Sequence, residues 1–577
     1  MKTILNSSRI FGFVLTLIIL LFASQNLSAQ LKADWVSRYN KSDMNDKATA
    51  MATDSRGFIY VTGCSEDKEG KIDILTVKYS SEGKEIWAAT FEGPSNADGD
   101  EDISSAIVSD NAGNIYITGS VHGGHHSRDL VLIKYGPDGN EVFARYFSGS
   151  LNIEDSDEEG TGLALDHEGH IIVAGITNGR NGNYDICALK YTTQGSLVWI
   201  NYYDNGSGDD DFAKKVAVDS EESIIISGTS TGINTGKDYI TVKYNLEGDE
   251  LWNAKYNGVG GNLAVNDEEV NAMTLDGQDN IYVTGYSTGA GSGRDFLTIK
   301  YDAAGRVQWI SRNDNLPQTK GYRNDEEASS IETDANGKVY ITGKTVSPEN
   351  GSHYYTVKLD ASGNTEWSKV FYNEEFGGVS DDGALDLAAD QNGNVYVTGY
   401  STGFGYESSC GGNKDFATIK YSSSGELKWV KRYNGAGRFE NSDDIAKVIE
   451  LDGRGGIIIM GESMGEQTEK DYCLIKYSEY VPYEETAEAK NDYRLNDNFP
   501  NPFNPVTKIS FDIPVPSNVR LAIYDISGRE VALLENNFLQ AGNHKYDWNA
   551  SQFSSGAYFC RIQSGSFDQT RKMLLIK

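Results

Sequence analysis

The stretch DGQDNIYVTGYSTGAG (residues 276–291) decides the fold, because the chain repeats it as DQNGNVYVTGYSTGFG at residues 390–405. Both copies contain G-Y-S-T-G, which satisfies the G-x-S-x-G pattern of a serine-hydrolase nucleophile elbow. An elbow needs a strand, a strained turn and a helix, whereas Ser287 and Ser401 lead into glycine-rich loops. Ser230, in GTSTG, holds the same place in a third copy. The motif therefore indicates a repeated building block and not a catalytic serine.

One glycine of this stretch recurs eight times, at spacings of 53 to 62 residues. It stands at Gly63, Gly119, Gly175, Gly228, Gly285, Gly343, Gly399 and Gly461. Nine residues before these glycines stand Asp54, Asp110, Asp166, Asp219, Asp276, Asp334, Asp390 and Asp452. After them come Lys78, Lys134, Lys190, Lys243, Lys300, Lys358, Lys420 and Lys476. A period of this length is typical of repeat architectures.

Each copy predicts four short strands, because its segments alternate or are β-branched and are bounded by Gly, Asn or Asp. Four strands in a repeat of this length are the signature of a β-propeller blade. Copy eight lacks the tryptophan segment that the others carry, whereas ADWVSRYN (residues 33–40) precedes the first copy. We predict an all-β fold, with an eight-bladed β-propeller over residues 31–480 that is closed by the N-terminal strand carrying Trp35.

These repeats resemble those of bacterial β-propeller repeat proteins (SBBP type), whose units carry D-x-x-G-N-I-Y-V-T-G followed by K-Y-x-x-x-G-x-x-x-W. The resemblance implies the propeller fold and a setting outside the cytoplasm. It implies no common activity.

The N-terminal segment, residues 1–29, is typical of a secretory signal peptide, because Lys2 and Arg9 precede an apolar run that ends in small residues. The run is too short to favour a spanning helix, so we expect no transmembrane segment in the mature chain. A net charge of −33 makes nucleic acid and anionic membranes poor partners. The five cysteines are isolated from one another, which argues against a disulfide framework, and Cys187 and Cys473 are expected to be buried.

The repeat gives way to an acidic linker over residues 481–494 and to a different domain over residues 495–577. Alternating segments and turns in this domain predict a small β-sandwich. Its NFPNPFNP (residues 498–505) and closing KMLLIK (residues 572–577) resemble the C-terminal sorting domain of the type IX secretion system. The resemblance implies export by that secretion machinery, and a secreted or outer-surface location in a Gram-negative bacterium.

Two kinds of cluster are candidate metal sites. His122, His125 and His126 gather in the second repeat with Asp129 nearby, and imidazoles at this density can hold zinc. Acidic connections such as NADGDEDIS (residues 96–104) offer the oxygen ligands that calcium prefers. The histidine spacing matches no closed structural site, the acidic connections fit no EF-hand pattern, and solvated loops explain both clusters without a metal.

We expect a secreted or surface-displayed, non-catalytic propeller that binds a polymer or a protein partner. Phe404 and Tyr406 are the candidate ligand-binding residues, because they lie in the longest loop between second and third strands, and irregular loops on a rigid frame often carry function. The alternatives are a secreted polysaccharide lyase or hydrolase, and an oxidoreductase like the quinoproteins, whose blades also end in tryptophan. Quinoprotein sites hold a neighbouring cysteine pair, and no two cysteines of this chain are close in sequence.

Two polar sets run through all eight copies. We expect contacts between the first-strand aspartate and the third-strand lysine in most copies, as between Asp276 and Lys300, because a buried lysine must be paired. Eight residues before these aspartates stand Asp46, Asp102, Glu158, Asp211, Glu268, Glu326, Asp382 and Asp444. We expect these acids around one mouth of the central channel, where they accept hydrogen bonds from backbone N–H groups rather than bind a cation on the axis.

Overall fold

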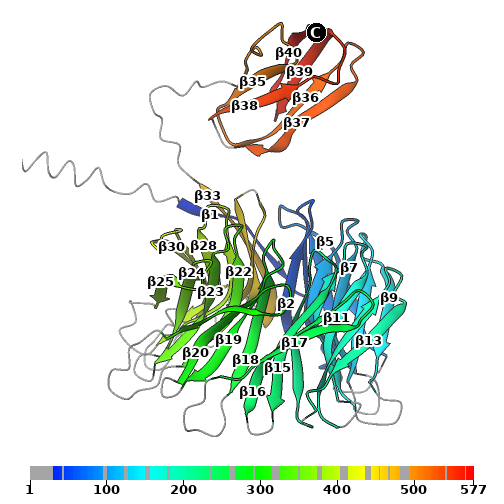
Figure 1. The fold of residues 1–577 in the computed structure, drawn as a ribbon, viewed down its shortest axis with the longest axis vertical. Helices are drawn as coiled ribbons and strands as arrows, with labels where there is room; N and C mark the ends of the chain where they lie inside the picture. Colours follow the sequence, from blue (N-terminus) through cyan, green and yellow to red (C-terminus); the bar gives the residue numbers. More distant parts are fainter. Residues whose placement is uncertain are drawn as a thin grey trace, which may run out of the picture. The chain divides into compact units, whose positions relative to one another are not determined.

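The computed structural model describes residues 30–41, 44–94, 101–122, 128–149, 156–178, 182–206, 208–232, 235–258, 267–289, 293–314, 325–347, 351–372, 380–402, 413–435, 443–453, 455–465, 468–480, 493–539, 542–565 and 567–577. Within these ranges the regular elements are all strands, and no helix is present (Figure 1). The predicted all-β class is therefore confirmed. The chain divides into two compact units, Met1–Tyr480 and Val481–Lys577.

In the described part of the first unit, seven sheets are built from strands that pair antiparallel in chain order. They are β2 (Asp46–Thr53), β3 (Ile59–Glu66), β4 (Ile72–Tyr79) and β5 (Glu85–Phe91); β6 (Ile103–Ser109), β7 (Ile115–His122), β8 (Arg128–Tyr135) and β9 (Glu141–Phe147); β10 (Glu158–Leu165), β11 (Ile171–Thr177), β12 (Asp185–Tyr191) and β13 (Leu197–Tyr203); β14 (Asp211–Val218), β15 (Ile224–Gly232), β16 (Gly236–Tyr244) and β17 (Glu250–Tyr256); β18 (Glu268–Leu275), β19 (Ile281–Gly289), β20 (Gly293–Tyr301) and β21 (Val307–Asn313); β22 (Asp325–Thr333), β23 (Val339–Ser347), β24 (Gly351–Leu359) and β25 (Thr365–Phe371); and β27 (Gly383–Ala389), β28 (Val395–Thr402), β29 (Lys414–Tyr421) and β30 (Leu427–Tyr433). A short strand, β26 (Ser380–Asp381), pairs parallel with β24.

The remaining sheet of this unit joins the two ends of the repeat region. It contains β31 (Ile445–Leu451), β32 (Gly456–Met464), β33 (Lys470–Tyr480) and β1 (Gln30–Tyr39). β1 pairs antiparallel with β33, and Trp35 lies opposite Lys476. The N-terminal strand thus supplies the tryptophan segment that the eighth repeat lacks, as the sequence predicted.

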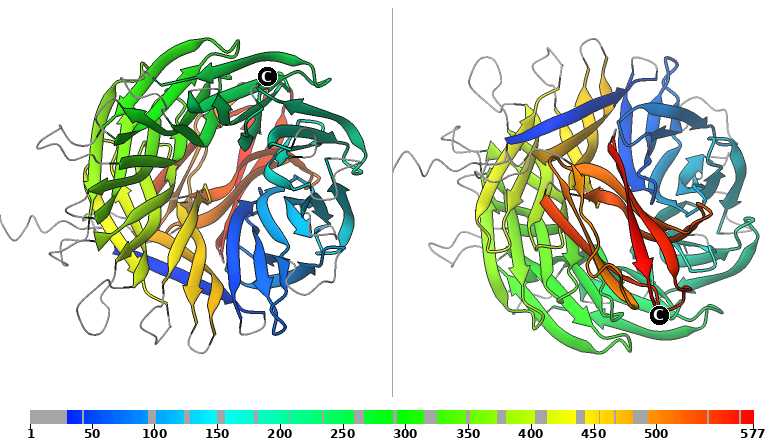
Figure 2. Two further views of the ribbon diagram at one scale, coloured as in Figure 1. Left: turned by 90° about the horizontal axis from the view of Figure 1, so that it is seen from below. Right: turned by 90° about the horizontal axis from the view of Figure 1, so that it is seen from above.

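Neighbouring sheets of the first unit lie side by side around a common centre (Figure 2). The first strand of each sheet packs against the first strand of the next, and β2 also contacts β31, β32 and β33. The hydrophobic cores lie between sheets: one cluster combines Tyr282 and Phe296 with Ile341 and Val357 of the following sheet. Because each sheet is covered on both faces, its middle strands are buried almost throughout.

The invariant aspartate that follows each first strand shapes the turn into the second strand. Oδ1 of Asp276 accepts hydrogen bonds from the backbone N–H groups of Gln278 (2.9 Å) and Asn280 (3.0 Å). Oδ2 accepts one from the Tyr282 hydroxyl at 2.8 Å. An aspartate is suited to this turn because its short side chain reaches the N–H groups two and four residues ahead.

The second unit forms two sheets around one core. Their strands are β34 (Arg494–Leu495), β35 (Val506–Ile513) and β38 (Gly542–Asn549), and β37 (Glu530–Leu539), β36 (Ser517–Tyr524), β39 (Gly556–Ser564) and β40 (Phe567–Leu575). Phe511 and Trp548 of the first sheet share a buried cluster with Leu521 and Ile562 of the second. This is the β-sandwich that the sequence predicted.

Candidate functional site: carboxylates between neighbouring sheets

The antiparallel pairing gives each sheet of the first unit two different edges. Turns from first to second strand and from third to fourth strand lie at one edge, and they keep nearly the same length throughout, as residues 276–280 and 302–306 show. The strand ends that all other connections join lie at the opposite edge, and the sequence between them ranges from three residues (290–292) to eleven (403–413). We call these the short-turn edge and the long-connection edge.

The acids that start the first strands lie at the long-connection edge and are buried. Their exposed fractions are 0% to 2% for Asp46, Asp102, Glu158, Asp211, Glu268, Glu326, Asp382 and Asp444. Backbone N–H groups donate to most of them: Gly435 (2.6 Å) and Met464 (3.0 Å) both donate to Asp444. The predicted backbone hydrogen bonding is confirmed, but the predicted position at a channel mouth is wrong, because the side chains lie between sheets.

A hydroxyl group on the second strand donates a further hydrogen bond to most of these acids. Ser287 on β19 donates to Glu268 at 2.9 Å, and Ser401 on β28 donates to Asp382 at 2.6 Å. Both serines are fully buried within continuous strands. The interpretation of G-x-S-x-G as part of a building block is confirmed. The pairing of these hydroxyls with the acids was not predicted, although serine or threonine stands two residues after the repeated glycine in seven copies.

Each of these acids also faces a second titratable residue, which starts the third strand of the preceding sheet. The pairs that influence each other are Asp73 with Asp102, Asp129 with Glu158, Asp238 with Glu268, Asp415 with Asp444 and Asp471 with Asp46. In the sixth sheet a histidine takes this place, and His353 Nδ1 lies 3.8 Å from Asp382 Oδ2. Like charges brought together between sheets are therefore a general feature of the long-connection edge.

Burial raises the pKa values of several of these carboxyls. It raises the pKa of Glu268 to about 7, and burial together with Asp444 raises the pKa of Asp415 to about 6. Burial with Asp314 and Asp295 nearby raises the pKa of Glu326 to about 8. Asp382 differs: burial acts against its charge, but hydrogen bonds from His353 and Ser401 hold its pKa below the usual value.

In the described ranges, two places bring three carboxylates together. Asp185, Asp204 and Asp211 form one group, and Asp295, Asp314 and Glu326 form the other. In each group, one carboxylate oxygen of every member lies within 4.8 Å of those of the other members. Carboxylate oxygens are the ligands that calcium and magnesium prefer.

A smaller polar cluster lies on the first strands, near the centre of the unit. Asp386 on β27 accepts hydrogen bonds from the Ser330 hydroxyl (2.7 Å) and the Ile449 N–H (3.0 Å). Glu332 accepts one from the Ala389 N–H at 2.7 Å. Burial raises the pKa values of Glu332 and Glu450, each to about 7. These acids vary between repeats, so the repeat pattern gave no signal for them.

The predicted contacts between the first-strand aspartate and the third-strand lysine occur in only half of the sheets. Ion pairs join Lys190 to Asp166, Lys243 to Asp219, Lys300 to Asp276 and Lys476 to Asp452, at 2.9, 2.6, 3.9 and 2.8 Å. Elsewhere the lysine reaches the next sheet, as Lys78 Nζ donates to the Pro137 carbonyl at 2.9 Å. The prediction of contacts in most sheets is therefore wrong, because the aspartate already accepts turn N–H groups and the neighbouring turn offers a carbonyl.

The histidine cluster and the aromatic candidates fall largely outside the described residues. His122 ends β7, and its backbone N–H donates to Asp102 Oδ1 at 3.0 Å. Asp129 is half-buried on β8, and burial raises its pKa. His125, His126, Phe404 and Tyr406 lie outside the described ranges.

The described cysteines are buried free thiols, as expected for Cys187 and Cys473. Burial raises the pKa of Cys64 to about 11 and that of Cys473 to about 12. Protonated, buried thiols are poor nucleophiles.

Comparison with known families finds one match in each unit of the chain. Residues 497–577 match the family described as "Secretion system C-terminal sorting domain", and residues 380–406 match the "Beta-propeller repeat". The chain therefore contains a secretion sorting domain and a segment that matches a beta-propeller repeat. The sorting domain indicates that the chain is secreted or lies on the outer surface, and that it interacts with the secretion machinery. Within the described ranges, no helix of this protein has the length and apolar character needed to cross a membrane.

Several solved structures are similar to this chain. The WD40 domain of SCAP from fission yeast is 10% identical over 78% of this chain and 99% of that chain, with a TM-score of 0.41. Drosophila Plexin A in complex with Semaphorin 1b is 9% identical over 78% and 88%, with a TM-score of 0.35, and an ancestral GH74 enzyme is 11% identical over 95% and 62%, with a TM-score of 0.34. We infer no activity from structures with such low sequence identity and TM-scores. No curated protein sequence matches the chain.

Proposed function

We propose that the chain is a closed, eight-bladed propeller, exported through the type IX secretion system of a Gram-negative bacterium, that binds an extracellular polymer or protein without catalysing a reaction. In this proposal residues 1–29 are a signal peptide, residues 31–480 the propeller, residues 481–494 a linker and residues 495–577 the sorting domain. Trp35 supports the closure, because its Nε1 donates to the Ser81 carbonyl of the first repeat at 3.2 Å.

The contrast between the two edges of the sheets carries the proposed binding role. The short-turn edge repeats one structure, in which the side chains of the turn bond to their own backbone. The long-connection edge holds segments that differ in length and sequence from repeat to repeat, over a frame of buried hydrogen bonds. A rigid frame that presents variable connections is the usual arrangement of a recognition surface.

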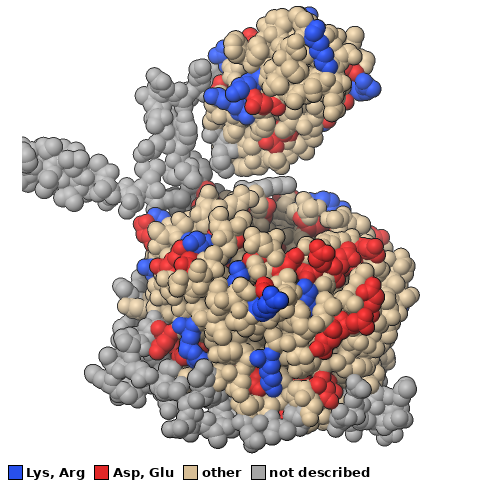
Figure 3. All heavy atoms as spheres, in the orientation of Figure 1, with Lys and Arg blue, Asp and Glu red and all other residues tan. Residues whose placement is uncertain are grey.

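The surface charge favours a partner that is neutral or basic. The chain carries a net charge of −33, and Figure 3 shows acidic side chains in patches on the visible face of the first unit. Long-range repulsion slows the approach of polyanions.

The test is a retention and cleavage assay. The purified chain is immobilised and exposed to neutral, basic and acidic polysaccharides and to the surface proteins of the same culture, and both retained and shortened material are scored. We expect retention without shortening, loss of retention in the double variant Phe404→Ala with Tyr406→Ala, and normal retention in Glu426→Gln, which changes an exposed residue of the short-turn edge. Shortened products would support a lyase or hydrolase, and retention of nothing would contradict the binding role.

A further inference from the structure

Three carboxylates of two neighbouring sheets converge at the long-connection edge. Asp295 lies on β20, Asp314 directly follows β21, and Glu326 lies on β22 of the next sheet. One oxygen of each lies within 4.8 Å of the oxygens of the other two. Two oxygens that bind one calcium ion at about 2.3–2.6 Å are at most about 4.6–5.2 Å apart. The separation is therefore that of ligands sharing one ion.

Glu326 has an oxygen that needs a partner. The side chain is 0% exposed, and the Thr345 hydroxyl donates to its Oε1 at 2.7 Å. Oε2 is buried and has no hydrogen-bond partner among the described residues. A buried carboxylate oxygen without a donor or a cation is strongly unfavourable.

Other repeats place a donor where this one places a third carboxylate. Asn40 follows β1 as Asp314 follows β21, and its side-chain amide donates to Asp471 at 3.0 Å. Asn257 and Asn434 stand at the same position of two further repeats. An ionised aspartate cannot donate a hydrogen bond. Asp314 therefore adds a negative charge at a position where three other repeats carry a neutral amide.

The charges of the group match a divalent cation. Arg312 donates to Oδ2 of Asp295 at 2.7 Å and offsets one of the three negative charges. When Glu326 releases its proton, the three carboxylates outnumber the one guanidinium. A divalent cation would offset this excess negative charge and would supply the missing partner of Glu326 at the same time.

We propose that Asp295, Asp314 and Glu326 bind a calcium ion that joins the sheet β18–β21 to the sheet β22–β25. Oxygen-only ligand sets suit hard cations, and calcium tolerates irregular sets that waters complete, whereas magnesium requires a near-octahedral arrangement. The ion adds a link between blades, and it does so whether or not the chain binds an extracellular partner.

The group Asp185, Asp204 and Asp211 holds the same three repeat positions two sheets earlier. Both oxygens of Asp211 already accept hydrogen bonds from Asn205, at 3.0 Å from the backbone N–H and 2.9 Å from the side-chain amide. At this repeat position, Glu326 thus has an oxygen without a donor among the described residues, whereas Asp211 does not.

The test compares calcium binding by the purified chain and by Asp314→Asn, after both have been stripped with EGTA and dialysed. Asp314 is exposed, and asparagine is the residue that other repeats carry at this position. Titration calorimetry with calcium chloride should show one ion fewer bound per chain by the variant, and calcium should raise its unfolding temperature less. Glu92→Gln is the matched control, because Glu92 follows β5 at the same repeat position, is 65% exposed and belongs to neither three-carboxylate group. It should bind as many ions as the unchanged chain.

Two results would overturn the proposal. One is that the stripped, unchanged chain takes up no calcium. The other is that Asp314→Asn binds the same number of ions with the same affinity. A second variant, Glu326→Gln, keeps the test decisive if Asp314→Asn fails to fold, because its amide can donate to the remaining carboxylates as Asn40 does to Asp471. It should lose the same ion, and circular dichroism confirms that its strands are intact.

Discussion

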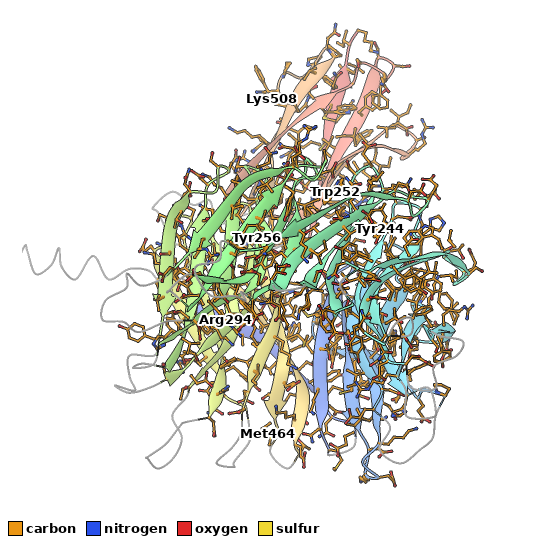
Figure 4. The ribbon with its side chains drawn as sticks, turned by 60° about the horizontal axis from the view of Figure 1, so that its bottom comes forward. Tyr244, Trp252, Tyr256, Arg294, Met464 and Lys508 are labelled. Atoms are coloured by element: carbon orange, nitrogen blue, oxygen red, sulfur yellow. The ribbon has the colours of Figure 1, made fainter. Side chains whose placement is uncertain are left out.

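The contact between Trp252 and Gly305 joins two neighbouring sheets, and its contribution to stability can be measured. Trp252 lies on β17 (Figure 4), and its Nε1 donates to the Ala303 carbonyl of the next sheet at 3.2 Å. Gly305 has φ of +78°, and a Cβ atom at this position would lie 2.6 Å from Cδ2 of Trp252. Gly305→Ala therefore combines a backbone penalty with a steric clash.

The two penalties can be separated by a control variant. An alanine in the left-handed region costs about 1–2 kcal/mol, and overpacking costs about a further 1–3 kcal/mol. We expect Gly305→Ala to lower the free energy of unfolding by about 2–5 kcal/mol. Gly337 has φ of +72°, but a Cβ there would lie 3.4 Å from the Ala361 Cβ, so Gly337→Ala should cost only the backbone term of about 1–2 kcal/mol.

Urea unfolding followed by tryptophan fluorescence measures this difference, because seven of the eight tryptophans lie in the first unit and only Trp548 in the second. In a Trp252→Leu background the extra cost of Gly305→Ala over Gly337→Ala should disappear. Equal losses for the two glycine variants in the unchanged background would refute the reasoning, since they would show that the indole ring moves aside freely.

Three further predictions follow from burial and from the sorting domain. The pKa of Glu268 is raised in the folded chain, so the folded state holds a proton that the unfolded state releases between about pH 4.5 and 7, and stability falls as the pH rises through that window. Urea unfolding of Glu268→Gln should show a gain of about 1–3 kcal/mol at pH 8 and almost none at pH 4, and an equal gain at both would contradict the shift. Removal of residues 497–577 should leave the chain inside the outer membrane, and immunoblots of culture fluid and periplasm would reveal normal release if the domain were not the export signal. In Cys410→Ser, a thiol reagent at pH 8 should label the native chain hardly at all and the urea-unfolded chain fully, since the remaining cysteines are buried; rapid native labelling would contradict this.

The repeat pattern predicted the sheets well, because the signals that define them are local. Each turn is set by an aspartate or glycine whose backbone role can be read from the sequence, as at Asp276. The pairing of β1 with β33 is a long-range contact, yet it was predictable, because a repeat without its tryptophan segment and a tryptophan segment without a repeat complete each other.

The position of the buried acids could not be predicted, because each first strand contains a β-bulge. In β18 the register shifts between Val270 and Ala272, and corresponding shifts occur in the other first strands. A bulge changes which face the following residues occupy, so strict alternation counted back from Asp276 assigns Glu268 to the wrong side. The sequence signal for the correct side is the hydroxyl of Ser287, which is two residues beyond the repeated glycine and bonds directly to Glu268.

The repeats differ in how they compensate the paired acidic groups between neighbouring sheets. Every pair of neighbouring sheets brings two titratable groups together at the long-connection edge, and like charges in a buried place must be neutralised. Beside Asp382, His353 stands where the third strands of the other sheets carry an aspartate. Elsewhere, the side-chain amide of Asn40 donates a hydrogen bond to Asp471. Around Glu326, Asp314 adds a third carboxylate, and one buried oxygen of Glu326 has no donor among the described residues. Residues that recur in every repeat thus form the contacts between neighbouring sheets. We expect a ligand site where the sequence of one repeat differs from that of the others.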